Sequence, residues 1–388
     1  MISAEGGNID YSSDATEEFK QANPLSNFVA VNTGTAEAPQ YVAYEKAYNG
    51  FLEDVVRNTN GADADRVGRM AAFGGAAQAA LTATGTTSDA VSGRFGMGQS
   101  ASALTYADNG QGTGMWVTPV YRSSDSDGFA AEGLEFGSDV SLFGVALGGD
   151  YSLGNGMRVG AMLNIGSGDA DGQGAGQGVS NDFNYFGGAM YAGFSMDALS
   201  VVADLSYTTV DSDIETDTVS GKVSTSFDTT ALSAGVTGQY TMDFAGVQVA
   251  PHAGLRFTRL DMDNFDAVGF DGGSAASVEN STANVFSIPV GVTIAKEYAG
   301  EQWTVKPSFD LTLTGNFGDD TLDSTVNWTD VTNWSVATKS EFVDSFTYGA
   351  AMGVAAKSGN LGVGVGLNYT GSSNIKEFGA SANVRYVF

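Results

Sequence analysis

His252 is the only histidine among the 388 residues, so it alone could act as an imidazole base. A hydrolase built on it would need a nucleophile and an orienting acid within hydrogen-bond reach, and no G-x-S-x-G motif accompanies it. The absence of cysteine excludes disulfides, thiolate nucleophiles and Cys-ligated metal sites. A single histidine also excludes His-pair metal sites. We therefore expect His252 to be a hydrogen-bonded structural residue, and we expect no enzyme active site and no cofactor.

Acidic side chains dominate the remaining chemistry. The chain has 45 Asp and Glu against 17 Lys and Arg, a formal net charge of -28, so nucleic acid is disfavoured as a partner because phosphate backbones bind basic faces. Four Asp-x-Asp pairs could bind Ca²⁺ or bridge it to lipopolysaccharide phosphates, but their spacing lacks the longer ligand pattern of an EF-hand. A solvated acidic rim is the simpler interpretation. The pairs are Asp125/Asp127, Asp169/Asp171, Asp211/Asp213 and Asp261/Asp263.

The elements that carry these residues alternate with a period of two from residue 115 onward. Met157, Val159 and Ala161 fall on one face of their segment, while Arg158 and Gly160 fall on the other. This alternation is typical of a β-strand with one apolar face. Twelve such strands are predicted, at residues 115–123, 140–153, 157–168, 182–196, 199–213, 225–243, 247–262, 284–298, 302–317, 341–357, 361–371 and 376–388.

Short and long connections alternate along this series, as they do in a transmembrane barrel whose strands run up and down. No run approaches roughly 18 consecutive apolar residues, so no transmembrane helix is predicted, but strands of about ten residues can cross a bilayer at a tilt. The predicted fold class is all-β, a 12-stranded antiparallel transmembrane β-barrel, rather than a soluble β-sandwich. The tight turns are predicted at 154–156, 197–198, 244–246, 299–301 and 358–360, and the long polar loops at 124–138, 169–181, 263–283 and 318–340.

Aromatic residues beside the tight turns fit an interfacial girdle. They are Tyr151, Phe194, Tyr240, Phe244, Tyr298 and Trp303.

The first 110 residues instead contain helical periodicity. Tyrosines and other apolar residues at spacings of three and four predict a helix over 39–57, and an alanine-rich helix is predicted over 63–84, with a short turn over 88–95. The small side chains of the second helix suit a narrow space. We divide the chain into residues 1–60, a passenger remnant or α-helical N-terminal region, residues 61–112, a linker and luminal helix, and residues 113–388, the barrel.

Polar residues on the inward faces of the predicted strands would line a water-filled lumen. One interpretation is a charged ring that contacts the helix and holds it as a plug. The alternative is that these residues pair with one another and keep the lumen wet. The candidate lumen and plug contacts are Arg158, Asp204, Gln239, Arg256, Lys306, Asp310, Asn368 and Arg385.

The last strand ends on an aromatic residue after regular alternation. Gly379 falls on the inward face, whereas Val384, Tyr386 and Phe388 point outward. These four residues resemble the terminal strand signal by which the barrel-assembly machinery recognises outer-membrane barrels. The simpler alternative is a last strand that happens to end in phenylalanine.

A luminal helix carrying Arg94, followed by a first strand that opens with Gly114-Met115-Trp116-Val117 and by this terminal signal, resembles the translocator of monomeric autotransporters, the type V secretion family. The resemblance covers residues 63–388. It implies a bacterial outer-membrane location, a helix plugging the pore and export of an N-terminal passenger to the cell surface. It further implies a monomer whose partners are outer-membrane lipid and lipopolysaccharide, the barrel-assembly machinery and its own passenger segment.

Some members of that family cleave their passenger inside the pore with lumen acids and an Asn-Asn pair on the helix. No such pair occurs in residues 63–114, so autoproteolysis is not predicted and Asp204 and Asp310 are expected to be structural. The alternative function is a self-contained outer-membrane barrel acting as a small pore or an adhesin.

Overall fold

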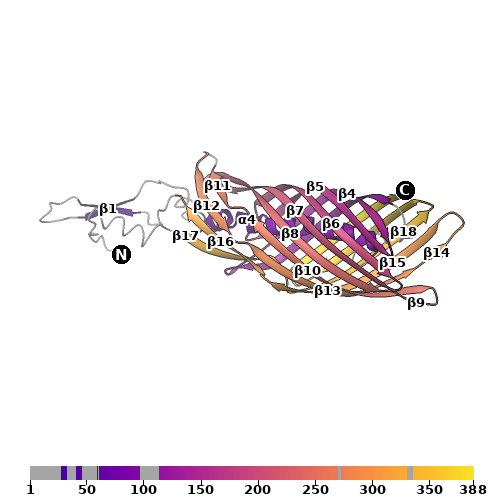
Figure 1. The fold of residues 1–388 in the computed structure, drawn as a ribbon. Helices are drawn as coiled ribbons and strands as arrows, with labels where there is room; N and C mark the ends of the chain where they lie inside the picture. Colours follow the sequence, from indigo (N-terminus) through magenta and orange to yellow (C-terminus); the bar gives the residue numbers. More distant parts are fainter. Residues whose placement is uncertain are drawn as a thin grey trace.

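The computed structural model describes residues 28–32, 41–45, 59, 61–96, 113–269, 272–329 and 335–388. Among these residues, the strands from β3 onward close into one antiparallel barrel, and Figure 1 shows them tilting around an indigo helical segment. The predicted twelve-stranded barrel is confirmed. Its wall consists of β3 (Thr113–Ala131), β4 (Leu134–Gly154), β5 (Met157–Gly174), β6 (Val179–Met196), β7 (Leu199–Thr218), β8 (Gly221–Tyr240), β10 (Val247–Met262), β13 (Ala283–Lys296), β15 (Thr304–Gly318), β18 (Phe346–Ser358), β19 (Leu361–Gly371) and β20 (Ile375–Val387).

The barrel closes where its last strand meets its first. β20 pairs with β3 from Ile375 opposite Ser126 to Val387 opposite Gly114. Two short strands, β9 (Met242–Phe244) and β14 (Tyr298–Ala299), continue the wall at the tight turns. Closure leaves no unpaired strand edge inside a membrane, where every backbone polar group needs a partner.

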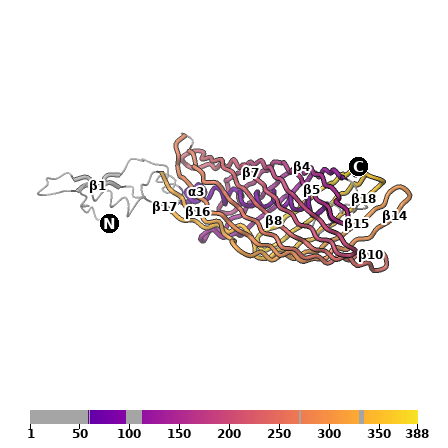
Figure 2. Tube along the Cα trace, in the orientation of Figure 1, coloured from indigo at the N-terminus to yellow at the C-terminus, as the bar shows by residue number. Residues whose placement is uncertain are grey.

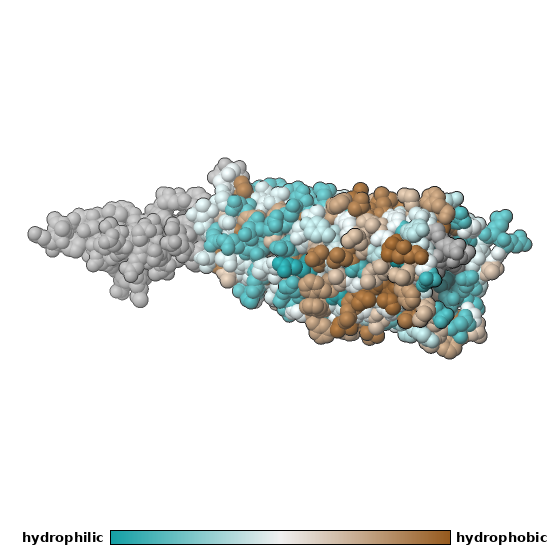
Figure 3. All heavy atoms as spheres, in the orientation of Figure 1, coloured by the Kyte–Doolittle hydropathy of each residue, from teal (hydrophilic) through white to brown (hydrophobic). Residues whose placement is uncertain are grey.

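An apolar band covers the outer surface of the barrel near the tight turns, where Figure 3 shows brown atoms gathered. The predicted girdle residues beside the turns are all exposed at this end, as are larger apolar residues such as Leu163 and Leu205. On β7 the outward face changes after Tyr207, which is followed on that face by Thr209 and Asp211. The end of the barrel with the long connections therefore stands beyond the apolar band.

The tight turns use backbone conformations that side chains rarely adopt. Asn155 and Asp197 have φ of 51°, and Ala245 has φ of 55°. Asparagine and aspartate tolerate this left-handed region better than most residues, and short hairpin turns require it. Short connections with such residues between two alternating segments were therefore sufficient to locate the tight turns in the sequence.

The long polar connections are mostly not loops, so that part of the sequence interpretation was wrong. β3 and β4 continue to a tight turn at Glu132 and Gly133, and β5 and β6 occupy most of residues 169–181. The connections at 263–283 and 318–340 contain further hairpins. Inward residues there stay apolar while outward residues become polar, because the outside meets water instead of lipid. The added strands are β11 (Phe265–Gly269), β12 (Ser274–Asn280), β16 (Thr321–Trp328) and β17 (Ser335–Glu341).

Three helical pieces pass through the barrel, and Figure 2 shows their indigo trace inside the strands. They are α3 (Ala62–Gly68), α4 (Met70–Phe73) and α5 (Ala76–Phe95). The predicted helix over 63–84 is therefore broken near Arg69 and at Gly74 and Gly75, and it joins the predicted turn over 88–95. Gly75 has φ of 65°, which favours glycine at this break. Within the described residues, no helix is both long and apolar enough to span a membrane.

The helix predicted over 39–57 was wrong for residues 41–45. These residues form β2 (Tyr41–Glu45), which pairs antiparallel with β1 (Phe28–Asn32). Aromatic and β-branched residues favour strands once a partner strand is available. The rest of the predicted helix lies outside the described residues.

Candidate functional site

The candidate site is the contact between the helical segment and the inner wall. α5 has 20 residues, and before Asp89 it consists almost entirely of alanine, threonine, serine and glycine. Ala79, Ala80 and Ala83 are completely buried, although a helix with so few large side chains has little apolar area of its own. Small side chains let the surrounding strands approach closely, so this sequence is matched to a narrow lumen.

The direction of the segment is fixed by contacts at its two ends. At the start, the backbone N–H of Val219, in the turn after β7, donates to Asp63 at 2.8 Å. At the end, Phe95 packs edge-on against Tyr191, with ring centroids 5.8 Å apart, near the tight turns. The chain therefore enters the lumen at the end with the long hairpins and leaves toward the end with the tight turns.

An apolar seal, which we call the mouth cluster, lies at the end with the long hairpins. Phe73 of α4 packs against Phe136 of β4 with ring centroids 5.1 Å apart, and Phe136 in turn contacts Phe129. Val67, Met70 and Phe73 are completely buried. The other wall residues of the cluster are Phe129, Ile214, Val326 and Trp328.

Polar groups at the helix breaks are bonded to the wall. The side-chain amide of Asn181 donates to the carbonyl of Gly74 at 3.0 Å, and that of Gln78 donates to the carbonyl of Phe342 at 2.6 Å. Arg69 binds Glu132 at 2.8 Å. The bond from Asn181 satisfies a carbonyl at the break in the helix, which has no further turn to accept from. The other two contacts attach side chains of the segment to the wall and so stabilise it in place.

A buried ion cluster holds the other end of α5. Asp150 of β4 binds Arg94 of the helix, with 2.8 Å between Arg94 Nη2 and Asp150 Oδ1. Arg158 also pairs with Asp150, and Arg385 lies 3.7 Å from it. A nearby hydrogen bond of 3.1 Å joins the Trp116 indole to the Tyr191 hydroxyl. Two of the predicted lumen residues, Arg158 and Arg385, thus share one carboxylate with the helix.

Arg122 of β3 forms a second attachment, which we call the seam clamp. Its guanidinium pairs with Asp89 of α5 and with Glu377 of β20. Since β3 and β20 are the first and last strands of the wall, the clamp joins the helix to both sides of the seam. The side chain of Arg122 is 9% exposed, so little water weakens these pairs.

The other predicted lumen charges pair within the wall. Arg256 forms a two-pronged bond with Asp204, at 2.8 and 3.0 Å, and also donates to Ser233. His252 lies 2.8 Å from Asp310, which additionally accepts hydrogen bonds from the hydroxyls of Thr293 and Thr312. The carboxylate of Asp310 is thus used in fixing neighbouring strands.

Three further predicted positions also lie on the wall. Gln239 is directly opposite His252 in the strand register, and Lys306 is opposite Ala355. Asn368 packs on Gly379 so closely that a Cβ on that glycine would lie 2.1 Å from its Oδ1. Within the predicted set, Arg158 and Arg385 lie beside the carboxylate that binds the helix, whereas Asp204, Arg256 and Asp310 bond to other wall residues. A ring that holds the helix as a plug stays a prediction.

Several residues that touch the helix were not singled out from the sequence. Asp150 and Arg122 occupy inward phases of predicted strands, so strand alternation was a sufficient signal for their orientation. Asn164 donates to Thr86 and Thr87 of α5 at 2.5 and 3.2 Å. Asp89 carried no signal beyond being an acid in a helix otherwise poor in charge.

The predicted terminal signal residues lie on β20 and at its end. Val384, Tyr386 and Phe388 are exposed, and the rings of Tyr386 and Phe388 are 5.1 Å apart. Among the described residues no group of three His, Asp or Glu side chains could hold a metal ion. The acidic pairs instead face outward beyond the apolar band, with Asp211 directly opposite Asp228 in the register.

Comparison with known proteins agrees with this architecture. A family model described as "Autotransporter beta-domain" matches residues 115–370. No curated protein sequence matches.

Three solved structures share the fold at low sequence identity. The translocator domain of the autotransporter NalP from Neisseria meningitidis superposes with a TM-score of 0.60 at 13% identity, covering 82% of this chain and 99% of that one. The β-domain of the Bordetella autotransporter BrkA gives 0.52 at 16% identity, over 72% and 100%. The transport unit of AIDA-I from Escherichia coli gives 0.52 at 12%, over 80% and 99%. The family match spans well over half of the sequence, and the chain belongs to the autotransporter β-domain family of bacterial outer-membrane translocators.

Proposed function

We propose that the segment of residues 61–96 is the trailing part of an exported polypeptide and remains in the lumen as its plug. The observation that carries this is the direction of the segment, from Asp63 at the end with the long hairpins to Phe95 near the tight turns. A chain that had crossed the pore with its N-terminal part leading would be left in this orientation. Residues preceding the segment would then be the passenger on the cell surface.

The seal is attributed to the mouth cluster together with the two ion clusters. Ions and water cross an apolar constriction poorly because they must shed hydration. The side chains of Phe73 and Met70 fill the lumen at the level where the wall offers Phe136 and Ile214. A filled mouth argues against a permanently open diffusion pore as the main activity.

Single-channel conductance in planar bilayers tests the plug. Deletion of residues 61–96 is expected to produce a stable open channel, while deletion of residues 1–58 should leave the conductance at the level of the full chain. If the deletion of 61–96 does not fold, the pair Phe73→Ala and Phe136→Ala should still raise the frequency of openings. Equal conductance of all three proteins would reject the plug.

Export is tested separately on intact cells. An epitope at Met1 should be accessible to added protease, whereas an epitope in the tight turn at Gly359 should be protected. Exposure of the turn epitope instead would reverse the orientation of the barrel and reject passenger export.

The barrel-assembly machinery is proposed as the partner of β20, through the outward residues Val384, Tyr386 and Phe388. Phe388→Ser is expected to lower the amount of inserted barrel several-fold in cells without changing refolding of the purified chain in detergent. The exposed position of Phe388, beyond the last pairs of β20 with β3, supports this because its ring is not needed for packing the wall.

The chain is proposed to act as a monomer without enzymatic activity. The proposed lack of enzymatic activity is supported by His252, whose partner Asp310 accepts from Thr293 and Thr312, so both hydroxyls serve the carboxylate and not the imidazole. Any hydrolytic activity measured with the purified barrel should be the same in His252→Ala as in the unchanged protein. Loss of such an activity in His252→Ala would contradict the proposal.

A further inference from the structure

The inner faces of β7 and β8 carry a series of buried hydroxyl groups that bond to no other group in the part of the chain that the structure describes. Ser206, Thr208 and Ser212 lie on β7, and Thr225 and Thr229 lie on β8. All five residues are at most 7% exposed. We call them the hydroxyl ladder.

The ladder is regular because the two strands are paired in register. Val210 stands opposite Thr229, and Ile214 stands opposite Thr225. Five consecutive inward rows, from Ser206 to Ile214 on β7, therefore each hold one member of the ladder. Neighbouring rows are two residues apart, which is about 6.7 Å along a strand.

The helix beside the ladder does not serve it. α5 packs against β7 and β8, and before Asp89 its side chains are almost all small. An α-helix bonds its backbone groups internally, and the hydroxyls of Thr84 and Thr86 donate to carbonyls of their own helix. The ladder oxygens also have almost no surface open to water. Since a buried hydroxyl without a partner lowers stability, the finished plug gives no reason for the ladder.

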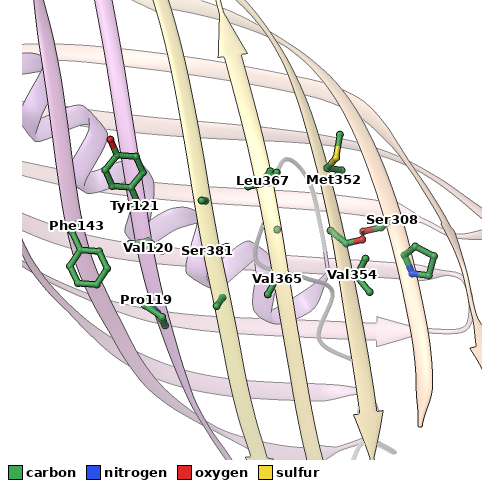
Figure 4. Close-up of a pocket in the computed structure, with 15 residues that line it drawn as sticks. Pro119, Val120, Tyr121, Phe143, Ser308, Met352, Val354, Val365, Leu367 and Ser381 are labelled. Atoms are coloured by element: carbon green, nitrogen blue, oxygen red, sulfur yellow. Dashed lines mark hydrogen bonds between the residues drawn. The ribbon is translucent and has the colours of Figure 1, made fainter.

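The outer surface of the wall is apolar at the level of the membrane. Figure 4 shows this at the seam, where Tyr121 and Leu367 are exposed and the helix lies behind the strands that carry them. On β7, Leu205 and Tyr207 are exposed in the same way, while the ladder faces inward between them. A partner of the ladder must therefore come through the lumen.

An extended polypeptide has the groups that match the ladder. In an extended chain the N–H and C=O of every second residue point to the same side, so bonding groups recur about every 6.7 Å. This repeat equals the spacing of the rows. A hydroxyl donates to a carbonyl or accepts from an N–H, so the contact does not depend on the sequence of the chain. Each bond is weak in competition with water, so a moving chain can exchange one row for the next.

We propose that the hydroxyl ladder binds the backbone of the exported polypeptide in an extended conformation, before α5 takes its place in the lumen. The proposal rests on passenger export and names the part of the wall along which the chain passes. When export ends, α5 covers the ladder and the hydroxyls are left without partners, as they are in the structure.

The rate at which an epitope at Met1 becomes accessible to protease on intact cells tests the ladder. Thr208→Val with Thr229→Val removes two hydroxyls at nearly constant side-chain shape, and exposure of the epitope is expected to slow about two- to tenfold. The same variant, purified and refolded in detergent, should keep or raise its guanidinium midpoint, because no bond is lost. Thr208→Ser with Thr229→Ser keeps both hydroxyls and should restore the export rate.

The matched control makes the same change on the outward face of the same strands. Thr209 and Thr230 stand opposite each other there, and Thr209→Val with Thr230→Val should export at the unchanged rate. Rates are compared at equal amounts of inserted barrel, measured by heat-dependent migration on gels. Equal slowing by the outward pair would assign the delay to the wall and overturn the proposal.

Two further outcomes separate the ladder from export itself. Normal exposure of the epitope at an unchanged rate in the inward valine variant would reject the ladder alone and leave its hydroxyls to water. If the unchanged chain never exposes the epitope, passenger export fails and the ladder fails with it.

Discussion

Arg94 of the luminal helix and Asp150 of β4 form a buried ion pair, in which both side chains are at most 3% exposed. Arg158 binds the same carboxylate from the wall, and Arg385 approaches it from β20. One wall aspartate thus joins the helix to β5 and to the last strand. Asp150 lies at the opposite end of the segment from the mouth cluster. The segment is therefore attached by apolar contacts at one end and by charged groups at the other.

Asp150→Ala is expected to destabilise the barrel strongly. The change removes the carboxylate around which Arg94, Arg158 and Arg385 converge, and breaking one partner of a buried pair typically costs about 3–5 kcal/mol. Tryptophan fluorescence during guanidinium unfolding in detergent measures the free energy of unfolding.

Glu215→Gln supplies the matched control for this experiment. Its partner Lys222 lies 2.7 Å away in an exposed pair beyond the membrane, where the hydrogen bond raises the pKa of Lys222. Exposed pairs contribute little to stability. If both substitutions had similar effects, Asp150 would have no special role in anchoring the helix.

Gly193→Ala is expected to displace the end of α5. A Cβ at this position of β6 would lie 2.1 Å from the Cε1 atom of Phe95, so the ring would have to leave its contact with Tyr191. Overpacking of this kind typically costs about 1–3 kcal/mol. The measurement combines unfolding free energy with bilayer conductance, which should rise if the helix loosens.

Phe95→Ala in the same chain should rescue Gly193→Ala, since it removes the atom that clashes. Gly238→Ala on β8 is the control, because nothing lies within 4 Å of the Cβ it would add. A defect that persists in the double variant would indicate a cause in the wall and not in the helix contact.

The seam clamp predicts coupling between Asp89 and Glu377, because both pair with Arg122. Asp89→Asn and Glu377→Gln should each lower stability by about 1–3 kcal/mol, as for hydrogen bonds to charged groups. Their effects should not add, with an interaction energy of at least about 0.5 kcal/mol in a double-mutant cycle. Strict additivity would mean that the helix and the seam are held independently.

The alternation of residues along each strand was enough to predict which side chains face the lumen. It was not enough to predict which of them form pairs. Alternation predicts that Arg158, Asp310 and Arg385 face inward, and all three are buried. Which charges meet depends on the register between strands far apart in sequence, such as β20 and β3, which brings Arg385 toward Asp150 of β4. The two partnerships of Asp150 with Arg94 and Arg385 could not be predicted from any single segment.

The added strands at the end with the long hairpins were missed for a physical reason. In β16, Leu322, Val326 and Trp328 face the inside, but the outward positions are polar because they meet water. If every strand is expected to have apolar residues on its outward face, such segments are interpreted as loops. The helix predicted over 39–57 failed for the opposite reason, since Tyr41 and Tyr44 fit a helical spacing until β1 supplies a partner strand.

Asp228→Asn is expected to stabilise the barrel at neutral pH. Asp211 and Asp228 stand directly opposite each other on the outer face beyond the apolar band. Burial, followed by the charges of Asp228 and Asp213, raises the pKa of Asp211 above its ordinary value of 3.8. Facing like charges destabilise a sheet, here by a few tenths of a kcal/mol, roughly, because water screens exposed pairs.

The pH dependence gives the sign of this effect. Because the pKa of Asp211 is higher in the folded state, the folded protein binds more protons between the folded and unfolded pKa values. Stability therefore rises as the pH falls through the folded pKa, and the advantage of Asp228→Asn should disappear there. It should also shrink in about 1 M salt, where the Debye length is about 3 Å. Asp266→Asn, which removes a charge opposite Ser277, should show neither trend; an equal gain from Asp266→Asn would assign the effect to net charge and not to the facing pair.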